Sequence, residues 1–199
     1  MKTIAAALAT LALVVACTPA AAPATPSPTP TPTALASLEP DESEAPVGAW
    51  NCTLPSHYAA TTDRAQLTDI RIGPRGSGPS GYDRILFQFE GQGTPEVDIR
   101  EGQPPFTEDP SGLPLEVAGE AWLLITFHGG TAVTPEGEQT YNGPTDFALG
   151  FPQVVEMKQA GDFEAVSDWI VGLRGPACHR VEIREAPTRL LIDVQHPQG

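Results

Sequence analysis

The chain of 199 residues carries 25 acidic and 11 basic residues, which gives a formal net charge of −14 at pH 7. A surface this acidic repels nucleic acid and anionic lipid headgroups, so a DNA- or RNA-binding function is excluded. Beyond a compositionally biased N-terminal part, about 150 residues remain, which is enough for one domain with a sizeable core and too few for two ordinary ones.

The first 17 residues have the pattern of an export signal. Lys2 precedes an apolar run at residues 4–16 that is too short to span a bilayer as a helix. The sequence Val-Val-Ala-Cys at residues 14–17 resembles the lipobox of bacterial lipoproteins. That resemblance implies cleavage before Cys17, a diacylglycerol on its sulfur, an acyl chain such as palmitate on its amino group, and a membrane anchor on the outer face of the cell membrane. The alternative is an ordinary secretory signal cleaved within residues 20–22, which removes Cys17.

Residues 18–47 are rich in Pro, Ala, Thr and Ser and lack a hydrophobic pattern. Such a segment cannot bury enough apolar surface to offset the entropy of ordering, so it is predicted to be a disordered linker. Proline stiffens it toward polyproline II, at about 3.1 Å per residue, so it could hold a domain up to ~90 Å from the membrane. Four acidic residues at positions 39–44 are interpreted as a solvated hinge.

Cys52 and Cys178 are the only cysteines after Cys17. In an exported domain they are predicted to form a disulfide that pins an N-terminal segment, residues 48–64, onto the fold. Two reduced thiols are the alternative. Because the two cysteines and the four histidines lack ligand spacing, neither a zinc site nor another cofactor is expected.

From residue 66 onward, apolar and polar residues alternate with the period of half-buried strands. The nine expected strands are residues 66–73, 82–90, 96–101, 113–119, 123–129, 154–158, 161–173, 180–184 and 189–195. Val181 and Ile183 belong to the expected apolar faces, and Phe163 and Trp169 are expected to anchor the core. Residues 56–66 are the one place left open for a helix. Short strands separated by turns predict an all-β fold, a single antiparallel β-sandwich in preference to a barrel.

Three segments carry a family resemblance: Tyr-Asp-Arg-Ile-Leu-Phe-Gln-Phe at residues 82–89, residues 161–173, and Pro-Thr-Arg-Leu-Leu-Ile-Asp-Val at residues 187–194. In this order they resemble AMIN-like domains of exported bacterial proteins and lipoproteins, over a domain expected at residues 65–197. The resemblance implies a β-sandwich without catalysis. AMIN domains accompany cell-wall amidases and pilus secretins and are associated with peptidoglycan binding. Because the sequence runs to Gly199, no amidase domain is expected after this one.

The candidate binding residues are Tyr82, Arg84, Arg189 and Asp193. Strand parity places Arg84, Arg189 and Asp193 opposite the main apolar face, where they form either a cross-strand ion pair or a surface that hydrogen-bonds a glycan or peptide, with Tyr82 stacking on a sugar ring.

No catalytic motif is found, so no enzymatic activity is expected. The expected function is binding of a cell-wall glycopeptide, a peptidoglycan-type component. The alternatives are a protein-interaction subunit of a surface assembly and a glycan hydrolase with paired carboxylates.

Overall fold

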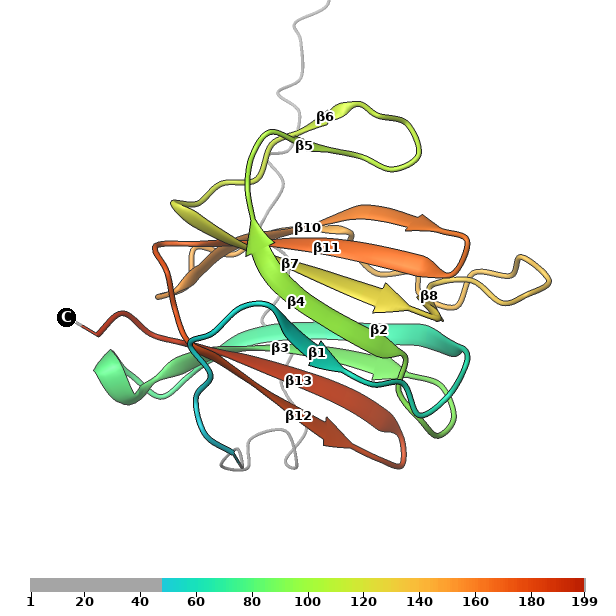
Figure 1. Ribbon diagram of the computed structural model, residues 1–199, viewed down its shortest axis with the longest axis horizontal. Coiled ribbons are helices and arrows are strands. Elements are labelled where there is room, and N and C mark those ends of the chain that lie inside the picture. Colours follow the sequence, from blue (N-terminus) through green and yellow to red (C-terminus); the bar gives the residue numbers. More distant parts are fainter. Residues whose placement is uncertain (1–47, 199) are drawn as a thin grey trace, which may run out of the picture. The chain divides into compact units, whose positions relative to one another are not determined.

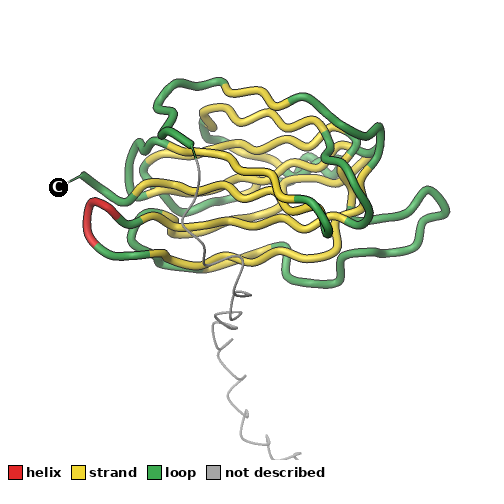
Figure 2. The backbone as a smooth tube through the Cα atoms, turned by 90° about the horizontal axis from the view of Figure 1, so that it is seen from below, coloured by secondary structure: helices red, strands yellow, loops and turns green. Residues whose placement is uncertain are grey.

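The computed structural model describes residues 48–198. In this range the chain forms two packed β-sheets (Figure 1), and its only helical element is the short 3-10 turn η2, Gly78–Ser80. Figure 2 shows the same chain as strands and connecting loops with that single turn in red. The predicted all-β sandwich is confirmed. No helix in the described range is long and apolar enough to cross a membrane. The predictions for residues 1–17 and 18–47, including lipidation of Cys17, lie outside the described residues.

The larger sheet has six strands in the order β1-β4-β7-β11-β10-β9, and all its neighbours are antiparallel. Its strands are β1 (Ser56–Tyr58), β4 (Glu96–Gly102), β7 (Ala121–His128), β9 (Asp146–Ala148), β10 (Val154–Phe163) and β11 (Val166–Leu173). The long central strands supply the inward side chains, and the short strands β1 and β9 form the two edges.

The smaller sheet has five strands in the order β12-β13-β3-β2-β8. Its strands are β2 (Ala65–Arg75), β3 (Tyr82–Phe89), β8 (Gly130–Thr131), β12 (His179–Arg184) and β13 (Thr188–Gln195). All pairs are antiparallel except β2 with β8, which is parallel. The three segments that carry the family resemblance therefore form β3 and β13 of this sheet, and the end of β10 together with β11 of the other.

The core lies between the two sheets and follows the alternation of the sequence. Ile85 and Phe87 of β3 and Leu190 and Ile192 of β13 are all fully buried. Phe87 meets Phe127 of the facing sheet edge-on, at 4.8 Å between ring centroids, and Phe87 also contacts Trp169 at 5.7 Å. Edge-on aromatic pairs of this kind add to the stabilisation that comes from burying their area.

The disulfide predicted between Cys52 and Cys178 is confirmed, with their Cα atoms 4.2 Å apart. Next to it, Asn51 and His179 form an isolated β-bridge, with both backbone hydrogen bonds in place. His179 is fully buried, and its Nε2 lies 3.0 Å from Oγ of Ser56 on β1. This anchor attaches the start of the described chain, and edge strand β1 with it, to the edge of the five-stranded sheet.

The two sheets are also joined by a buried carboxylate. Asp83 points inward from β3, and its Oδ2 accepts hydrogen bonds from the backbone N–H groups of Gln153 and Val154 at 2.8 and 2.7 Å. Its Oδ1 lies 2.9 Å from Nε2 of His196. All four residues are at most 3 % exposed. The start of β10 is therefore fixed to β3 of the opposite sheet.

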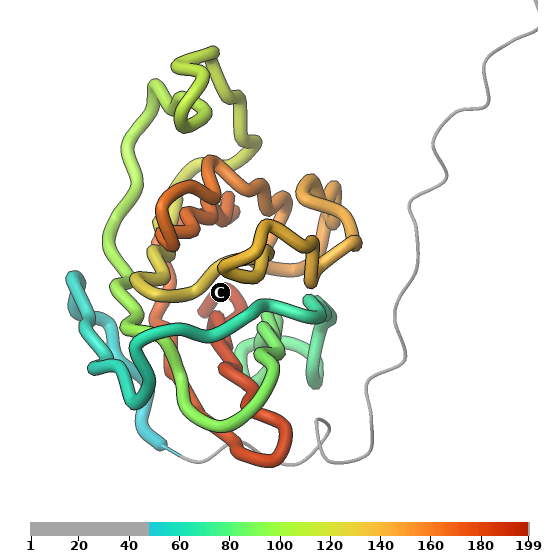
Figure 3. Tube along the Cα trace, turned by 90° about the vertical axis from the view of Figure 1, so that its right-hand side faces the viewer, coloured from blue at the N-terminus to red at the C-terminus, as the bar shows by residue number. Residues whose placement is uncertain are grey.

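Residues 103–118 form an arm outside the sandwich, built on a two-stranded hairpin of β5 (Phe106–Thr107) and β6 (Pro114–Leu115). Figure 3 shows the arm in yellow-green, projecting beyond the six-stranded sheet. The base of the arm lies directly on the sheet, because a Cβ atom added at Gly172 of β11 would collide with the carbonyl oxygen of Ala118.

Five expectations from the sequence are wrong. Residues 161–173 are two strands, because Glu164 and Ala165 adopt positive φ angles of 51° and 62° and close a two-residue hairpin turn. Phe163, expected in the core, is consequently 51 % exposed at the end of β10. Ile183, near the end of edge strand β12, is 43 % exposed rather than buried.

The other two concern segments that are not regular strands or helices of the expected length. Residues 113–119 contribute only the two residues of β6, because they pack in the arm. Residues 56–66, left open for a helix, begin with strand β1 and end in the start of β2.

Candidate functional site

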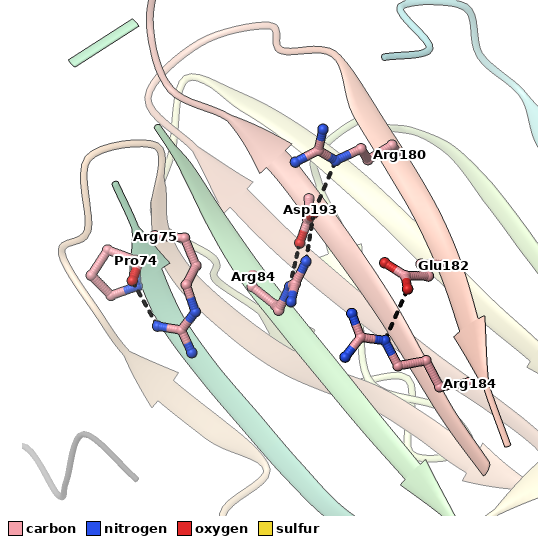
Figure 4. A network of polar contacts seen from close by, with 7 residues as sticks. All are labelled: Pro74, Arg75, Arg84, Arg180, Glu182, Arg184 and Asp193. Atoms are coloured by element: carbon pink, nitrogen blue, oxygen red, sulfur yellow. Dashed lines mark hydrogen bonds and ion pairs between the residues drawn. The ribbon is translucent and has the colours of Figure 1, made fainter. Parts of the chain in front are cut away.

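Arg84 and Asp193 are paired on the outer face of the five-stranded sheet, where they lie directly opposite each other on β3 and β13. Nε and Nη2 of Arg84 donate to the two carboxylate oxygens of Asp193 at 2.7 and 3.0 Å. Arg180, opposite Asp193 on β12, donates a third hydrogen bond from Nε at 3.0 Å. Figure 4 shows both guanidinium groups directed at this one carboxylate. The cross-strand ion pair is therefore present.

Burial determines what this pair can do. Arg84 is 0 % and Asp193 is 2 % exposed. Burial acts to lower the pKa of Arg84, but the hydrogen bonds and charge of Asp193 outweigh it and raise that pKa above its ordinary value. Arg84 therefore stays charged inside the sheet face. Side chains this buried do not reach a ligand, so the pair acts on the sheet itself.

Two aromatic rings surround Arg180 at the margin of this cluster. Its guanidinium carbon lies 4.0 Å from the ring centroid of Trp50 and 4.8 Å from that of Tyr82. The two rings meet edge-on at 6.2 Å. Trp50 and Tyr82 are half-buried, and they are held in place by these cation–π contacts and by the nearby disulfide. Tyr82 is thus part of the cluster, and its stacking on a sugar ring stays a prediction.

Arg189, the fourth candidate, does not join this cluster. It lies four residues before Asp193 on β13, opposite Gln88 on one side and Arg184 on the other. At about 3.3 Å per residue along a strand, that separation is roughly 13 Å. The structure therefore brings together three of the four sequence-predicted binding residues.

A groove lies elsewhere, between the arm and the six-stranded sheet. It has a volume of about 610 Å³ and is lined by arm residues 104–106 and 114–118 and by Glu156 and Lys158 of β10. We call it the arm groove. Three prolines and Phe106 form much of its apolar wall, and Phe106 is held edge-on against Trp122 of β7 at 5.9 Å. Volumes in this range, with apolar walls and few polar groups, are typical of binding sites.

The polar side of the arm groove comes from outward-facing residues of β10. Nζ of Lys158 lies 3.3 Å from a carboxylate oxygen of Glu156 and 3.3 Å from one of Asp146 on β9. Partial burial lowers the pKa of Lys158, but the two carboxylates outweigh it and raise that pKa overall, so the ammonium is charged at neutral pH. Glu156 also accepts a hydrogen bond from the backbone N–H of Ala118 at 2.5 Å, which ties the arm to the sheet.

The charges around the arm groove do not balance. Lys158 contributes one positive charge, whereas Glu116 and Glu156 in the lining and Asp146 beside it contribute three negative ones. Glu116 is exposed, while Glu156 is already engaged by Lys158 and Ala118. The groove is therefore a shallow apolar surface with an acidic margin, suited to binding a ligand that combines apolar groups with an ammonium group.

The sequence-based choice of candidate residues did not include the arm groove. Its residues come from two segments about 50 positions apart, and neither carries a motif. One signal was present: Ile170 and Ala160 are apolar on the strand faces opposite the main core, and they are buried because the arm covers them. Apolar residues on both faces of a strand indicate a second covering layer.

Comparison with known families gives one match. The family model described as AMIN-like domain matches residues 65–196. Neither the curated proteins nor the solved structures contain a match.

Proposed function

Because the chain belongs to the AMIN-like domain family, we propose that it is a non-catalytic module that binds a peptidoglycan-type cell-wall component in the arm groove. AMIN-like domains are associated with peptidoglycan or envelope interactions. The family and the disulfide are consistent with an extracytoplasmic envelope protein. In the proposal, Cys17 carries the lipid that anchors the chain to the outer face of the cell membrane, and the segment at residues 18–47 carries the domain toward the wall.

The observation that carries the proposal is the composition of the arm groove. Its proline rings and Phe106 offer flat apolar surfaces, against which sugar rings and short aliphatic side chains pack. Its excess of carboxylates suits the free ammonium group of a wall peptide. Lys158 can in turn pair with a peptide carboxylate. A glycopeptide supplies all three kinds of group in one ligand.

The geometry also favours binding over hydrolysis. A glycosidase needs two carboxyl groups that flank a bond of the substrate and are open to it. Of the two glutamates that line the arm groove, Glu156 is engaged by the Lys158 ammonium and the Ala118 amide. This engagement supports a role in holding the arm rather than in proton transfer.

Cosedimentation of the full chain with purified cell-wall sacculi tests the proposal. We expect saturable binding well above that of an unrelated lipoprotein of similar acidity. Acetylating the free amino groups of the sacculi should weaken this binding, because it removes the ammonium groups that the acidic margin attracts. Sedimentation no greater than that of the unrelated lipoprotein would refute the proposal.

A second candidate function is supported by two exposed apolar side chains. Leu113 in the arm is 59 % exposed, and Phe163 at the β10–β11 turn is 51 % exposed. The loop between β5 and β6 is bonded to the β10–β11 hairpin, since the N–H of Asp109 donates to the carbonyl of Ala160 at 2.6 Å. Exposed apolar groups are common at protein interfaces, so the alternative is a subunit of a surface assembly. Crosslinking in cells through position 113 should then recover one dominant protein partner, and recovery of none would exclude it.

A further inference from the structure

Two histidines and two carboxylates converge on the outer face of the six-stranded sheet, at the edge formed by β1, β4 and β7. His57 of β1 lies opposite Asp98 of β4, and Glu96 of β4 lies opposite His128 of β7. Glu96 and Asp98 are two residues apart and so share one face of β4, while Val97 between them points into the core with no exposed surface. The register alone therefore places the four polar side chains on one outward patch.

The distances within this patch are close to those between ligands of one metal ion. Nδ1 of His57 lies 2.9 Å from one carboxylate oxygen of Asp98, and Nε2 of His128 lies 3.3 Å from the other. One ligand atom from each of His57, Glu96 and Asp98 lies within 4.8 Å of the others. Zinc binds nitrogen and oxygen at about 2.0–2.2 Å, which separates tetrahedral neighbours by about 3.3–3.5 Å. Small side-chain rotations would thus bring the ligand atoms of His57, Glu96 and Asp98 into one coordination sphere, and His128 lies next to it through its contact with Asp98.

We propose that His57, Asp98, Glu96 and His128 form a binding site for a divalent transition metal, with zinc as the best-fitting ion. Imidazole nitrogen favours zinc, copper and nickel over magnesium and calcium, which prefer all-oxygen sites. With neutral histidines the two carboxylates carry a charge of −2, which a divalent cation neutralises. The net charge of −14 of the whole chain further favours cation binding.

The site is open to an incoming ion. The side chains of His57 and His128 are 56 % and 45 % exposed, and that of Asp98 is 35 % exposed. Metal binding would replace the hydrogen-bonded protons between the histidines and Asp98. It would also join edge strand β1, which has only three residues, to the two strands beside it. The bound ion would therefore stabilise the attachment of β1 to the sheet, in addition to the Cys52–Cys178 disulfide.

The competing interpretation is a surface cluster of ion pairs, which contributes about 0–1 kcal/mol and binds no metal. Titration of the full chain with Zn²⁺ distinguishes the two, using protein made without a histidine tag and stripped with EDTA. We expect saturable binding of one Zn²⁺ per chain. His57→Ala and His128→Ala should each weaken Zn²⁺ binding at least tenfold. The control is Glu101→Gln, which removes an exposed carboxylate from β4, the strand that carries Glu96 and Asp98, and should leave Zn²⁺ binding unchanged.

Two further measurements keep the test decisive. The far-UV circular dichroism and the unfolding midpoint in EDTA should be the same for the variants and the parent, because both histidines lie on the surface. Zn²⁺ should raise the unfolding midpoint of the parent and of Glu101→Gln but not of the histidine variants. Absence of saturable Zn²⁺ binding, or binding that both histidine variants retain, would overturn the proposal. Calcium binding of equal strength would overturn it as well, because that result would indicate carboxylates alone.

Discussion

Replacing Asp83 by alanine should be among the most destabilising single changes in the domain. Oδ2 of Asp83 accepts two backbone hydrogen bonds from the start of β10, and Oδ1 contacts His196, all in the interior. Hydrogen bonds to a charged group contribute about 1.5–3 kcal/mol each, and leaving buried amides without a partner adds a cost of its own. The two backbone bonds alone predict a loss of about 3–6 kcal/mol. That is a large fraction of the 5–15 kcal/mol by which domains are usually stable.

Urea unfolding followed by tryptophan fluorescence, to which the fully buried Trp169 contributes, measures this loss. The matched control is Glu90→Ala, which removes an exposed carboxylate directly after the same strand. The control should change the free energy of unfolding by no more than about 0.5 kcal/mol. If Asp83→Ala cost less than about 1 kcal/mol, the view that this carboxylate joins the two sheets would be wrong.

Three further predictions concern the disulfide, a buried histidine and the ion pair. Reducing the Cys52–Cys178 disulfide, which joins residues 126 positions apart, should lower the free energy of unfolding by up to about 5 kcal/mol in denaturation with and without reductant. Burial lowers the pKa of His179 below its ordinary value. As the pH falls, the His179 imidazole is therefore protonated in the unfolded chain before it is protonated in the folded one. The contribution of His179 to stability should therefore be constant above about pH 7 and fall as the pH drops through 6.5, and an NMR titration should place the His179 pKa below 6.5. Asp193→Asn should cost about 3–5 kcal/mol, because it leaves Arg84 charged and buried without its carboxylate, whereas Arg84→Met combined with Asp193→Leu should cost clearly less in urea unfolding, with the lost contact of Arg180 as its remaining cost. Equal losses in the single and double variants would contradict this explanation.

The central strands were predictable because their alternation is local and unbroken. Ile85 and Phe87 on β3 and Leu190 and Ile192 on β13 alternate with polar residues, and all four are buried as expected. The same parity placed Arg84 and Asp193 on the outward face of their strands, and the strand register then decides that these two residues pair. The disulfide followed from the cysteine count and the inferred compartment.

The β10–β11 turn was not predictable for a definite reason. Two-residue hairpin turns are usually marked by glycine or asparagine, which tolerate positive φ angles. Here Glu164 and Ala165 adopt them instead. Because neither residue type indicates a turn, the apolar–polar alternation of residues 161–173 predicts one continuous strand with Phe163 in the core.

The arm groove and the histidine cluster were beyond sequence reasoning for a different reason. The groove joins Phe106 of the arm to Lys158 of β10, and the cluster joins His57 to His128 across three strands. Such contacts depend on strand order and register, which the alternation of one strand does not specify. Spacing along the chain therefore gave no indication of a metal site.

The central claim is that the arm groove binds the cell wall, and blocking the groove tests it most directly. Ala118 is exposed in the lining of the groove, so Ala118→Trp should fill it, whereas Ala60→Trp places the same bulk on an exposed loop position after β1. The measurement is the binding isotherm of each full-length variant on purified sacculi. We expect Ala118→Trp to bind at least tenfold more weakly than the parent and Ala60→Trp to bind like the parent. Equal binding by the two variants would contradict the account.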